Sequence, residues 1–265
     1  MSATTPPRPL NGTNTSNADI TVFRGWEDPG KYVWSPYVTK LEARLRLADV
    51  KYGVAAGSVK AGPKGKIPYV ECSVPSTAVT PTGAQKVVLG DSTLIIKSLM
   101  EWDIIPDLNS EVNPQDRAED LALRALLEDK LTFYHVSCCQ SMKPVKTSSW
   151  LTSPKGWERW IQNYYIMRDH VLWSVPYPVR LLVGLMIHRN MTATLHGQGT
   201  GRFSAFEIAA FRREIWEGFS DLLLSSKANS NAEGADPFWV LGGEHPTEAD
   251  CVLFGFIVSV LVCKA

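Results

Sequence analysis

Two short segments carry residue types that can bind or activate a small charged molecule. In the first, Ser35 precedes Pro36, a pairing typical of a helix N-cap with proline at the first helical position. In the second, Asp91 and Ser92 follow a β-prone run and open another helix. A carboxylate there can receive an ammonium group, and a hydroxyl with free helix N–H groups can receive a carboxylate. Ser35 and Asp91 could equally be ordinary helix caps.

A third segment lies between these two in the sequence and leads a proline into a strand. Pro68 follows Ile67 at the start of a predicted strand over 67–71. Cis X–Pro bonds are about 5–6% of those in folded proteins, so the residues alone do not predict the isomer. The preceding Gly-Pro-Lys-Gly-Lys run is not a phosphate-binding loop, because Lys60 stands where that motif needs glycine and Ile67 where it needs serine or threonine.

Strand and helix signals alternate through the first part of the chain. Val38, Leu41 and Leu45 recur at helical spacing after Pro36, which predicts a helix with one buried face. A small mixed α/β layer unit is therefore expected over 19–103. Its predicted strands are 20–23, 51–54, 67–71 and 86–89, and its second predicted helix opens at Asp91–Ser92.

The second part of the chain reads as all-helical. Segment 104–116 contains prolines and asparagines and predicts an interdomain linker. Ser204 and Glu207 have the spacing of a capping box, and Thr247 with Asp250 repeats it with Asp in place of Glu. We read the Thr247–Asp250 pair as a structural element. Helices are predicted over 117–140, 157–173, 204–225 and 251–262.

The charge balance excludes several classes of function. The chain has 265 residues, with 27 Lys and Arg against 27 Asp and Glu. A nucleic-acid binder usually has a basic excess, so a nucleic-acid partner is not expected. The five histidines are scattered without metal-like spacing, and the five cysteines form no C-x-x-C pair, so no metal site is expected. An odd number of thiols indicates a reducing compartment.

The N-terminal region suggests neither secretion nor membrane insertion. Residues 1–18 are rich in Thr, Pro, Asn and Ser, which predicts a disordered tail rather than a signal peptide. The longest apolar run near the middle, 181–187, is too short to cross a bilayer. No transmembrane segment is expected, and the expected location is the cytoplasm.

Several segments in order resemble the cytosolic glutathione transferase superfamily, and within it the failed-axon-connections and metaxin-like branch, which includes fungal cadmium-resistance-like proteins. The resemblance spans roughly residues 20–262 and implies a thioredoxin-like N-terminal domain over 19–103, followed by a helical glutathione-transferase domain over 117–265. The fold class is thus α/β plus all-α. The segments that carry the resemblance are 35–42, 63–71, 91–96, 157–160, 196–202 and 246–250.

The resemblance also implies roles for the residues singled out above. Ser35 would stabilise the thiolate of bound glutathione, because the thiolate is the nucleophile and a helix N-terminus is positive. The Ile67–Pro68 bond would be cis, and Ile67 would offer backbone groups to the peptide. Asp91 and Ser92 would hold the γ-glutamyl end. Lys66 would contact the glycyl carboxylate, although a solvated surface lysine is the more common outcome.

Two functions remain open at this stage. One is a glutathione-dependent transferase acting on a small electrophile or a biosynthetic intermediate, in detoxification or secondary metabolism, with glutathione as cosubstrate. The other is a non-catalytic binding or assembly protein, as metaxin-like relatives suggest. The family's helical domain normally continues past the Thr247–Asp250 helix, so a shortened C-terminus is expected. The apolar residues of that helix would then be partly exposed or covered by a partner such as a second copy: Phe254, Phe256, Ile257, Val260 and Leu261.

Overall fold

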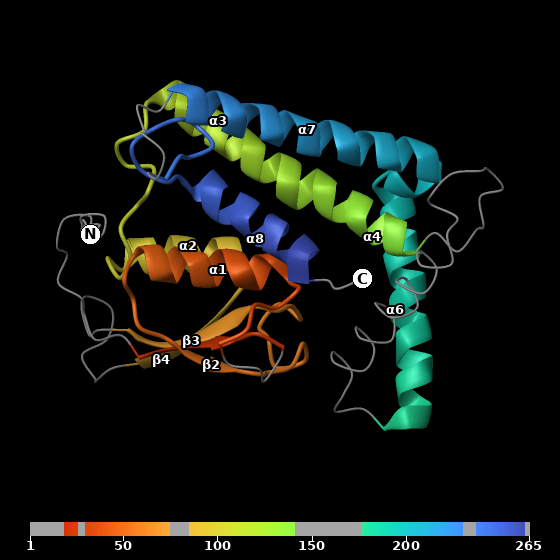
Figure 1. The fold of residues 1–265 in the computed structure, drawn as a ribbon. Helices are drawn as coiled ribbons and strands as arrows, with labels where there is room; N and C mark the ends of the chain where they lie inside the picture. Colours follow the sequence, from red (N-terminus) through yellow and green to blue (C-terminus); the bar gives the residue numbers. More distant parts are fainter. Residues whose placement is uncertain (1–18, 26–29, 75–84, 141–175, 230–236, 263–265) are drawn as a thin grey trace, which may run out of the picture. The chain divides into compact units, whose positions relative to one another are not determined.

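The computed structural model describes residues 19–25, 30–74, 85–140, 176–229 and 237–262. The chain divides into two compact units, Met1–Asp107 and Leu108–Ala265 (Figure 1). The tail predicted over 1–18 and the helix predicted over 157–173 lie outside the described residues. The division between the units falls within the predicted linker segment.

The first unit is a thioredoxin-like layer of one sheet and two helices. Its sheet has the order β2-β1-β3-β4, in which β1 and β2 are parallel and the other pairs are antiparallel. Both helices lie over the same face of the sheet (Figure 1). The predicted fold class is confirmed. The elements are β1 (Ile20–Phe23), α1 (Pro36–Leu47), β2 (Gly53–Ala55), β3 (Tyr69–Val74), β4 (Gln85–Gly90) and α2 (Ser92–Glu101).

The core of this unit lies between the sheet and the two helices. Alternate residues of the strands and every third or fourth residue of the helices point into it, which is the geometry that their sequence patterns predict. Two residues of the predicted linker, Ile104 and Ile105, are also buried there. The other buried members are Ile20, Val22, Leu41, Leu45, Val70, Cys72, Ile95, Ile96 and Leu99.

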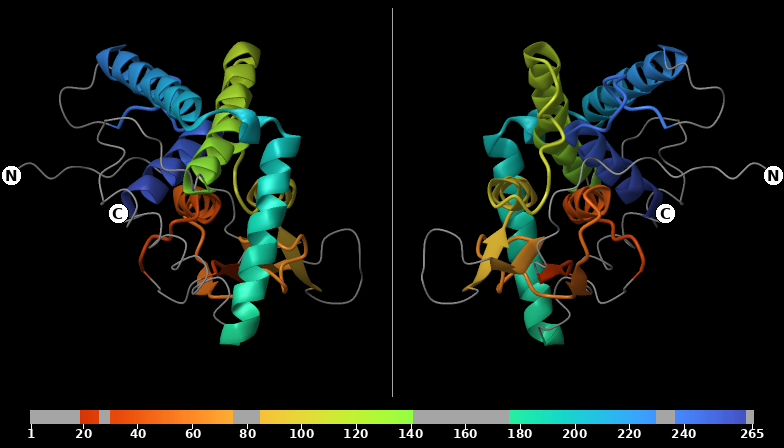
Figure 2. Two further views of the ribbon diagram at one scale, coloured as in Figure 1. Left: turned by 90° about the vertical axis from the view of Figure 1, so that its right-hand side faces the viewer. Right: turned by 90° about the vertical axis from the view of Figure 1, so that its left-hand side faces the viewer.

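The described residues of the second unit form helices and connecting loops, with no strand among them. The helix predicted over 117–140 is one continuous rod in Figures 1 and 2, and its central turn is a π-helix. A helix over Tyr177–Gly197 was not predicted, because Pro178 and Gly184 interrupt its apolar pattern; Pro178 is tolerated in the first turn. The elements are α3 (Pro114–Ala125), η1 (Leu126–Leu131), α4 (Thr132–Gln140), α6 (Tyr177–Gly197), η3 (Thr200–Arg202), α7 (Ala205–Asn229) and α8 (Glu248–Val262).

The predicted Ser204–Glu207 capping box is present in this unit. Ser204 N and Oγ donate to the Glu207 carboxylate at 2.7 and 2.8 Å, and Glu207 N donates back to Ser204 Oγ at 3.3 Å. This reciprocal pattern sets the start of α7. The boundary predicted at 225 was four residues short, because α7 continues to Asn229.

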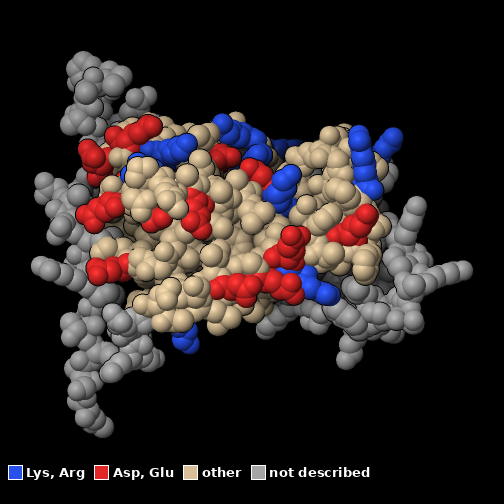
Figure 3. All heavy atoms as spheres, turned by 90° about the horizontal axis from the view of Figure 1, so that it is seen from above, with Lys and Arg blue, Asp and Glu red and all other residues tan. Residues whose placement is uncertain are grey.

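On the face shown in Figure 3, acidic and basic side chains both occur.

Candidate functional site

The register of the sheet brings two of the three predicted site segments to one edge. Phe23, the last residue of β1, pairs with Tyr69, the first residue of β3. Tyr69 in turn pairs with Gly90, the last residue of β4. Pro68 and Asp91 are the chain neighbours of this row, so both lie at the same edge of the sheet.

The peptide bond before Pro68 is cis, as the resemblance implied. Pro68 is buried and Ile67 is half-buried, whereas Lys66 is exposed. The chain that follows β1 packs closely here. Gly25 has a φ of +82°, and a Cβ added to it would stand 3.0 Å from Ile67 Cδ1. Only glycine fits that combination of backbone conformation and contact without strain.

Asp91 is the N-cap of α2 in the structure. Its φ of +77° is rare for a residue with a side chain, and its Oδ1 accepts from Thr93 N at 3.2 Å and from Leu94 N at 3.4 Å. The cap interpretation is therefore confirmed for Asp91. Both capping bonds use Oδ1, so neither occupies Oδ2. The adjacent Ser92 is buried, with 4% of its surface exposed.

Gly90 has a packing role that the sequence did not suggest. A Cβ at Gly90 would stand 3.3 Å from Pro63 Cδ and 3.5 Å from Lys64 N. In the structure the close neighbour is the 63–64 segment of the same unit, and this contact accounts for the glycine.

Ser35 occupies the N-cap position of α1 but does not cap it. Its backbone is extended, with φ −73° and ψ 114°, and its carbonyl accepts the first helical bond from Thr39 N at 3.2 Å. Its side chain makes no capping hydrogen bond within the described residues. Pro36 has no N–H to satisfy, and the first turn contains no acidic residue. The positive end of α1 is therefore not neutralised by a side chain of its own first turn.

A buried ion pair that was not predicted from the sequence joins the residue after β1 to the middle of α1. Arg24 Nε stands 2.8 Å from Glu42 Oε1, with 2% and 3% of the two side chains exposed. The N–H does not point along this line, so the contact is an ion pair and not a linear hydrogen bond. Burial raises the pKa of Glu42, while Arg24 and Arg46 oppose that rise. One signal was available: Glu42 lies between Leu41 and Leu45 on a face that is otherwise apolar.

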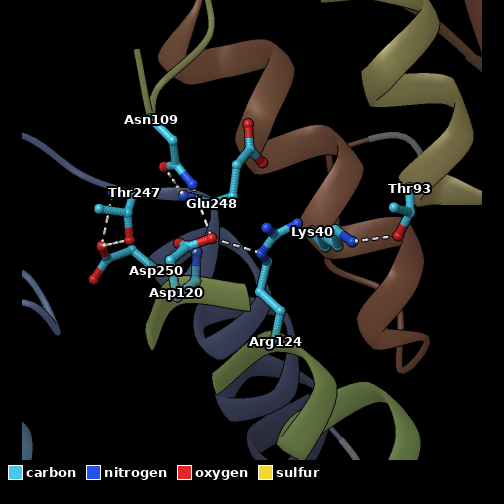
Figure 4. A network of polar contacts seen from close by, with 9 residues as sticks. Lys40, Thr93, Asn109, Asp120, Arg124, Thr247, Glu248 and Asp250 are labelled. Carbon is cyan, nitrogen blue, oxygen red and sulfur yellow. Dashed lines mark hydrogen bonds and ion pairs between the residues drawn. The ribbon is translucent and has the colours of Figure 1, made fainter. Parts of the chain in front are cut away.

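A second buried charge joins the two helices of this unit. Lys40 has 2% of its surface exposed, and its Nζ donates to Thr93 Oγ1 at 2.9 Å (Figure 4). Thr93 is in the first turn of α2, directly after Asp91 and Ser92. The contact therefore holds the N-terminal half of α1 beside the start of α2.

The start of α8, in the helical unit, is surrounded by side-chain acceptors (Figure 4). Asp250 Oδ2 accepts from Thr247 N at 2.8 Å and from Thr247 Oγ1 at 3.0 Å. Asn109 Oδ1 accepts from Glu248 N at 3.2 Å, and Asp120 Oδ1 accepts from Ala249 N at 2.7 Å. The capping interpretation of Thr247 and Asp250 is confirmed as structural. Asn109 and Asp120 were not predicted, because each is more than a hundred residues away in the sequence.

Asp120 is the centre of this network. It is fully buried, and its Oδ2 accepts from Asn109 Nδ2 at 2.8 Å and lies 2.7 Å from Arg124 Nε. Both carboxylate oxygens are thus engaged. A buried carboxylate is stable only when it is paired in this manner.

The expected partial exposure of α8 is correct for four of the five residues and wrong for Phe256. Phe254, Val260 and Leu261 are exposed, with 38%, 48% and 72% of their surfaces accessible. Phe256 is buried in the core of the helical unit, and Ile257 is half-buried against it. The helix therefore has a buried and an exposed side although its sequence is apolar nearly all round.

The remaining titratable groups show no catalytic arrangement in the described part of the chain. Burial raises the pKa of the Cys72 thiol to about 11, and burial with the charge of Arg212 lowers the pKa of His135 to about 4. Cys72 is therefore protonated and unreactive at neutral pH. Among the described residues, no cluster of three metal-ligating side chains occurs. The side chains of Cys138 and Cys139, and all of His170, lie outside the description.

The N-terminal part of the chain matches a known family model. Residues 36–144 match the family model described as the glutathione S-transferase N-terminal domain. The match begins at Pro36, one residue after Ser35, and covers less than half of the chain. Together with the sheet topology it identifies a glutathione-transferase-like fold.

Three solved structures are distantly similar. A glutathione transferase homologue from Lodderomyces elongisporus, solved with two glutathione molecules per subunit, is 17% identical, with 92% of this chain and 84% of that chain covered and a TM-score of 0.38. Glutathione transferase Omega 2S from Trametes versicolor, in complex with 2,4-dihydroxybenzophenone, is 15% identical over 80% and 99%, with a TM-score of 0.32. A second structure of Omega 2S is 17% identical over 80% and 97%, with a TM-score of 0.33.

None of the described helices is both long and apolar enough to cross a bilayer.

Proposed function

We propose that this protein binds glutathione at the sheet edge of its N-terminal unit and uses the bound thiolate as a nucleophile. One observation carries the proposal. Among the described residues Ser35 does not cap α1, and Pro68 and the Asp91 turn lie together at one edge of the sheet. The matched glutathione S-transferase N-terminal domain model supports this choice of ligand.

Ser35 is proposed to stabilise the thiolate. Its hydroxyl is not consumed by capping, so it is available to donate a hydrogen bond to an anionic sulfur. The N-terminus of α1 adds a partial positive charge that no acidic residue of the first turn cancels. A lowered thiol pKa raises the thiolate fraction at neutral pH, which is the reactive form.

Asp91, Ser92 and the Ile67 backbone are proposed to hold the peptide. The γ-glutamyl ammonium would approach Asp91 Oδ2, the oxygen that the α2 cap leaves unused. Ser92 and the first N–H groups of α2 would receive the γ-glutamyl carboxylate. The Ile67 main chain would pair with the central residue of the peptide. Lys66 is exposed and would reach the glycyl carboxylate.

The proposed reaction is addition or displacement at a small electrophile. The thiolate sulfur forms a bond to the electrophilic carbon. In a displacement the leaving group departs with the electron pair of its bond, and in an addition the adduct takes up a proton from water.

Detoxification or secondary metabolism in the cytoplasm is the proposed setting, and the failed-axon-connections and metaxin-like branch is the proposed lineage. A homodimer is the proposed assembly, which light scattering at several protein concentrations would test.

A conjugation assay with 1-chloro-2,4-dinitrobenzene tests the proposed function. The thiolate displaces chloride, and the aryl thioether is followed by its absorbance. We expect glutathione-dependent turnover that Ser35→Ala lowers and that Ser259→Ala, a buried serine of the helical unit, leaves unchanged. Binding of glutathione without turnover by the wild type would favour the non-catalytic alternative, and absence of both would refute the glutathione site.

A further inference from the structure

Arg24 is placed where three parts of the N-terminal unit meet. It directly follows β1, and its backbone N–H donates to Ala55 O at 2.9 Å, next to the β1–β2 pair. Its side chain is almost fully buried. An arginine has the most donors of any side chain in a fixed geometry, so one buried arginine can bind several elements at once.

The side chain of Arg24 contacts both the chain before α1 and α1 itself. Its Nη2 donates to the main-chain oxygen of Lys31, and its Nε pairs with Glu42 Oε1 at 2.8 Å. Glu42 lies two helical turns after Ser35, about 10 Å along the axis of α1. Arg24 therefore connects the end of β1 to points on both sides of Ser35.

The position of Ser35 relative to the sheet depends on contacts other than a cap of its own side chain. Its hydroxyl makes no capping hydrogen bond in the described part of the chain. The local contact there is from Thr39 Oγ1 to Val33 O, at 3.3 Å, and this contact joins α1 only to its own preceding residues. A contact between α1 and the sheet is needed to fix the position of Ser35 relative to the edge that carries Ile67 and Pro68. The Arg24 contacts provide such a link.

We infer that Arg24 is the positioning residue for Ser35: through Glu42 and the Lys31 carbonyl it holds the start of α1 in register with the sheet edge that carries Pro68. This inference rests on the proposed function for its catalytic consequence. Arg24 touches neither glutathione nor the reacting atoms in this scheme, so it acts on the thiolate only through Ser35. Misplacement of a reacting group by about 1 Å can cost about 10²-fold in rate.

The chain offers a matched control for Arg24. Arg46 Nη2 lies 3.1 Å from Glu42 Oε2, so both arginines pair with the same carboxylate. Arg46 is half exposed, its Nε donates to Tyr52 OH at 3.0 Å, and its guanidinium lies 5.6 Å from the centre of the Tyr32 ring. A lysine at position 46 keeps a cation near that ring, so the control removes neither the charge nor a main-chain contact of the segment before α1. Arg24→Lys and Arg46→Lys are thus the same chemical change beside the same carboxylate. Lysine keeps the charge in each case but lacks the second nitrogen that reaches Lys31 O from position 24.

Three measurements on the full chain test the inference. Calorimetry gives glutathione affinity, the pH profile of kcat/KM gives the apparent thiolate pKa, and amide hydrogen exchange reports order over residues 30–39. For Arg24→Lys we expect a rate about tenfold lower, a thiolate pKa about one unit higher, affinity within threefold of wild type, and about tenfold faster exchange over 30–39. Arg46→Lys should stay within twofold in all of them.

The outcomes separate this inference from the proposed function. Equal rates, pH profiles and exchange in the two variants would overturn the positioning role. If the wild type neither binds nor turns over glutathione, the proposed function fails. The exchange comparison then decides alone: faster exchange over 30–39 in Arg24→Lys supports the anchoring, and equal exchange overturns it. If Arg24→Lys does not fold, Glu42→Gln, which keeps an oxygen facing Arg24, takes its place with the same expected results.

Discussion

The start of α1 and the start of α8 satisfy their backbone groups in opposite ways. At α8, side-chain oxygens of Asn109, Asp120 and Asp250 accept from successive main-chain N–H groups. At α1, Ser35 stands at the N-cap position and its hydroxyl makes no capping bond among the described residues. A helix needs acceptors for its first N–H groups, and these come from side chains, water or a ligand. At α8 the acceptors are side chains of the protein itself, whereas at α1 the Ser35 side chain supplies none among the described residues.

The capping of α2 is intermediate between that of α1 and that of α8. Asp91 caps it through Oδ1 alone, so the cap is complete while one carboxylate oxygen stays outside it. The comparison teaches that residue type at an N-cap position does not decide its role. The Ser35 side chain does not cap α1, and Asp91 caps α2 through one of its two oxygens. At α8 the first N–H groups donate to Asp250 and to two distant buried side chains, Asn109 and Asp120. A saturated helix start stabilises the fold, and an open one can receive an anion.

The largest effect on the free energy of unfolding is expected at the start of α8. Asp120→Ala removes a fully buried carboxylate and leaves Arg124, Asn109 and the Ala249 N–H without it. Loss of one partner from such a buried pair costs about 3–5 kcal/mol. Denaturant unfolding of the variant should show a loss of this size. Glu119→Ala, an exposed acidic neighbour in α3, should stay within about 0.5 kcal/mol of wild type.

At the start of α1, substitution of Ser35 should lower the rate of glutathione conjugation and leave the stability of the fold nearly unchanged. Ser35→Ala should lower glutathione conjugation about 10²-fold, the usual loss when one donor to a developing anion is removed. Because the hydroxyl makes no capping bond, the free energy of unfolding should change by less than about 0.5 kcal/mol. The checks are steady-state kinetics and thermal melts of the same preparation. A loss of about 1 kcal/mol with unchanged turnover would show that Ser35 is a cap after all.

At the start of α2, two substitutions of Asp91 can separate its capping role from its proposed binding role. Asp91→Ala should weaken glutathione binding by about 1–3 kcal/mol, the range for losing one partner of a charged hydrogen bond. It should also destabilise α2 by about 1 kcal/mol through the lost cap. Asp91→Asn keeps a capping oxygen but not the charge, so it should lose affinity and retain stability. If the two variants bind glutathione as well as the wild type does, Asp91 is only a cap.

The smallest effect is expected at a single member of the α8 cap. Thr247→Ala removes one donor to Asp250 Oδ2 but leaves the Thr247 N–H contact and the Asn109 and Asp120 contacts in place. The expected cost is about 0.5–2 kcal/mol in the free energy of unfolding. A cost equal to that of Asp120→Ala would mean that the capping box, and not the buried carboxylate, holds this helix start.

Local pattern was sufficient for much of the N-terminal unit. Helical spacing after Pro36 predicted α1, and β-prone runs predicted all its strands. The predicted starts of β2 and β3 were each two residues early. For β3 the cause is Pro68, which has no N–H to donate to the ladder. The cis state of the Ile67–Pro68 bond was reachable only through the family resemblance, because its own residues do not determine the isomer.

Contacts between distant residues were beyond sequence reasoning. Nothing local indicates that Arg24 meets Glu42, or that Asp120 accepts from the start of a helix more than a hundred residues later. The π-helical turn at Leu126–Leu131 also escaped, since a helical apolar period does not reveal one added residue. Glu42, a charged residue between Leu41 and Leu45, was the available warning, because burial of a charge requires a partner. Asp120 carried no such signal, since Asp116, Arg117 and Arg124 lie one turn away from it on α3.

Calorimetric titration of the full chain with glutathione is the most direct test of whether the open start of α1 and the Asp91 turn form a ligand site. The expected result is binding at millimolar ligand or below, with one site in the N-terminal unit, weakened by Asp91→Ala and unchanged by the exposed-surface variant Glu119→Ala. Absence of any binding at millimolar glutathione by the folded wild type would contradict it.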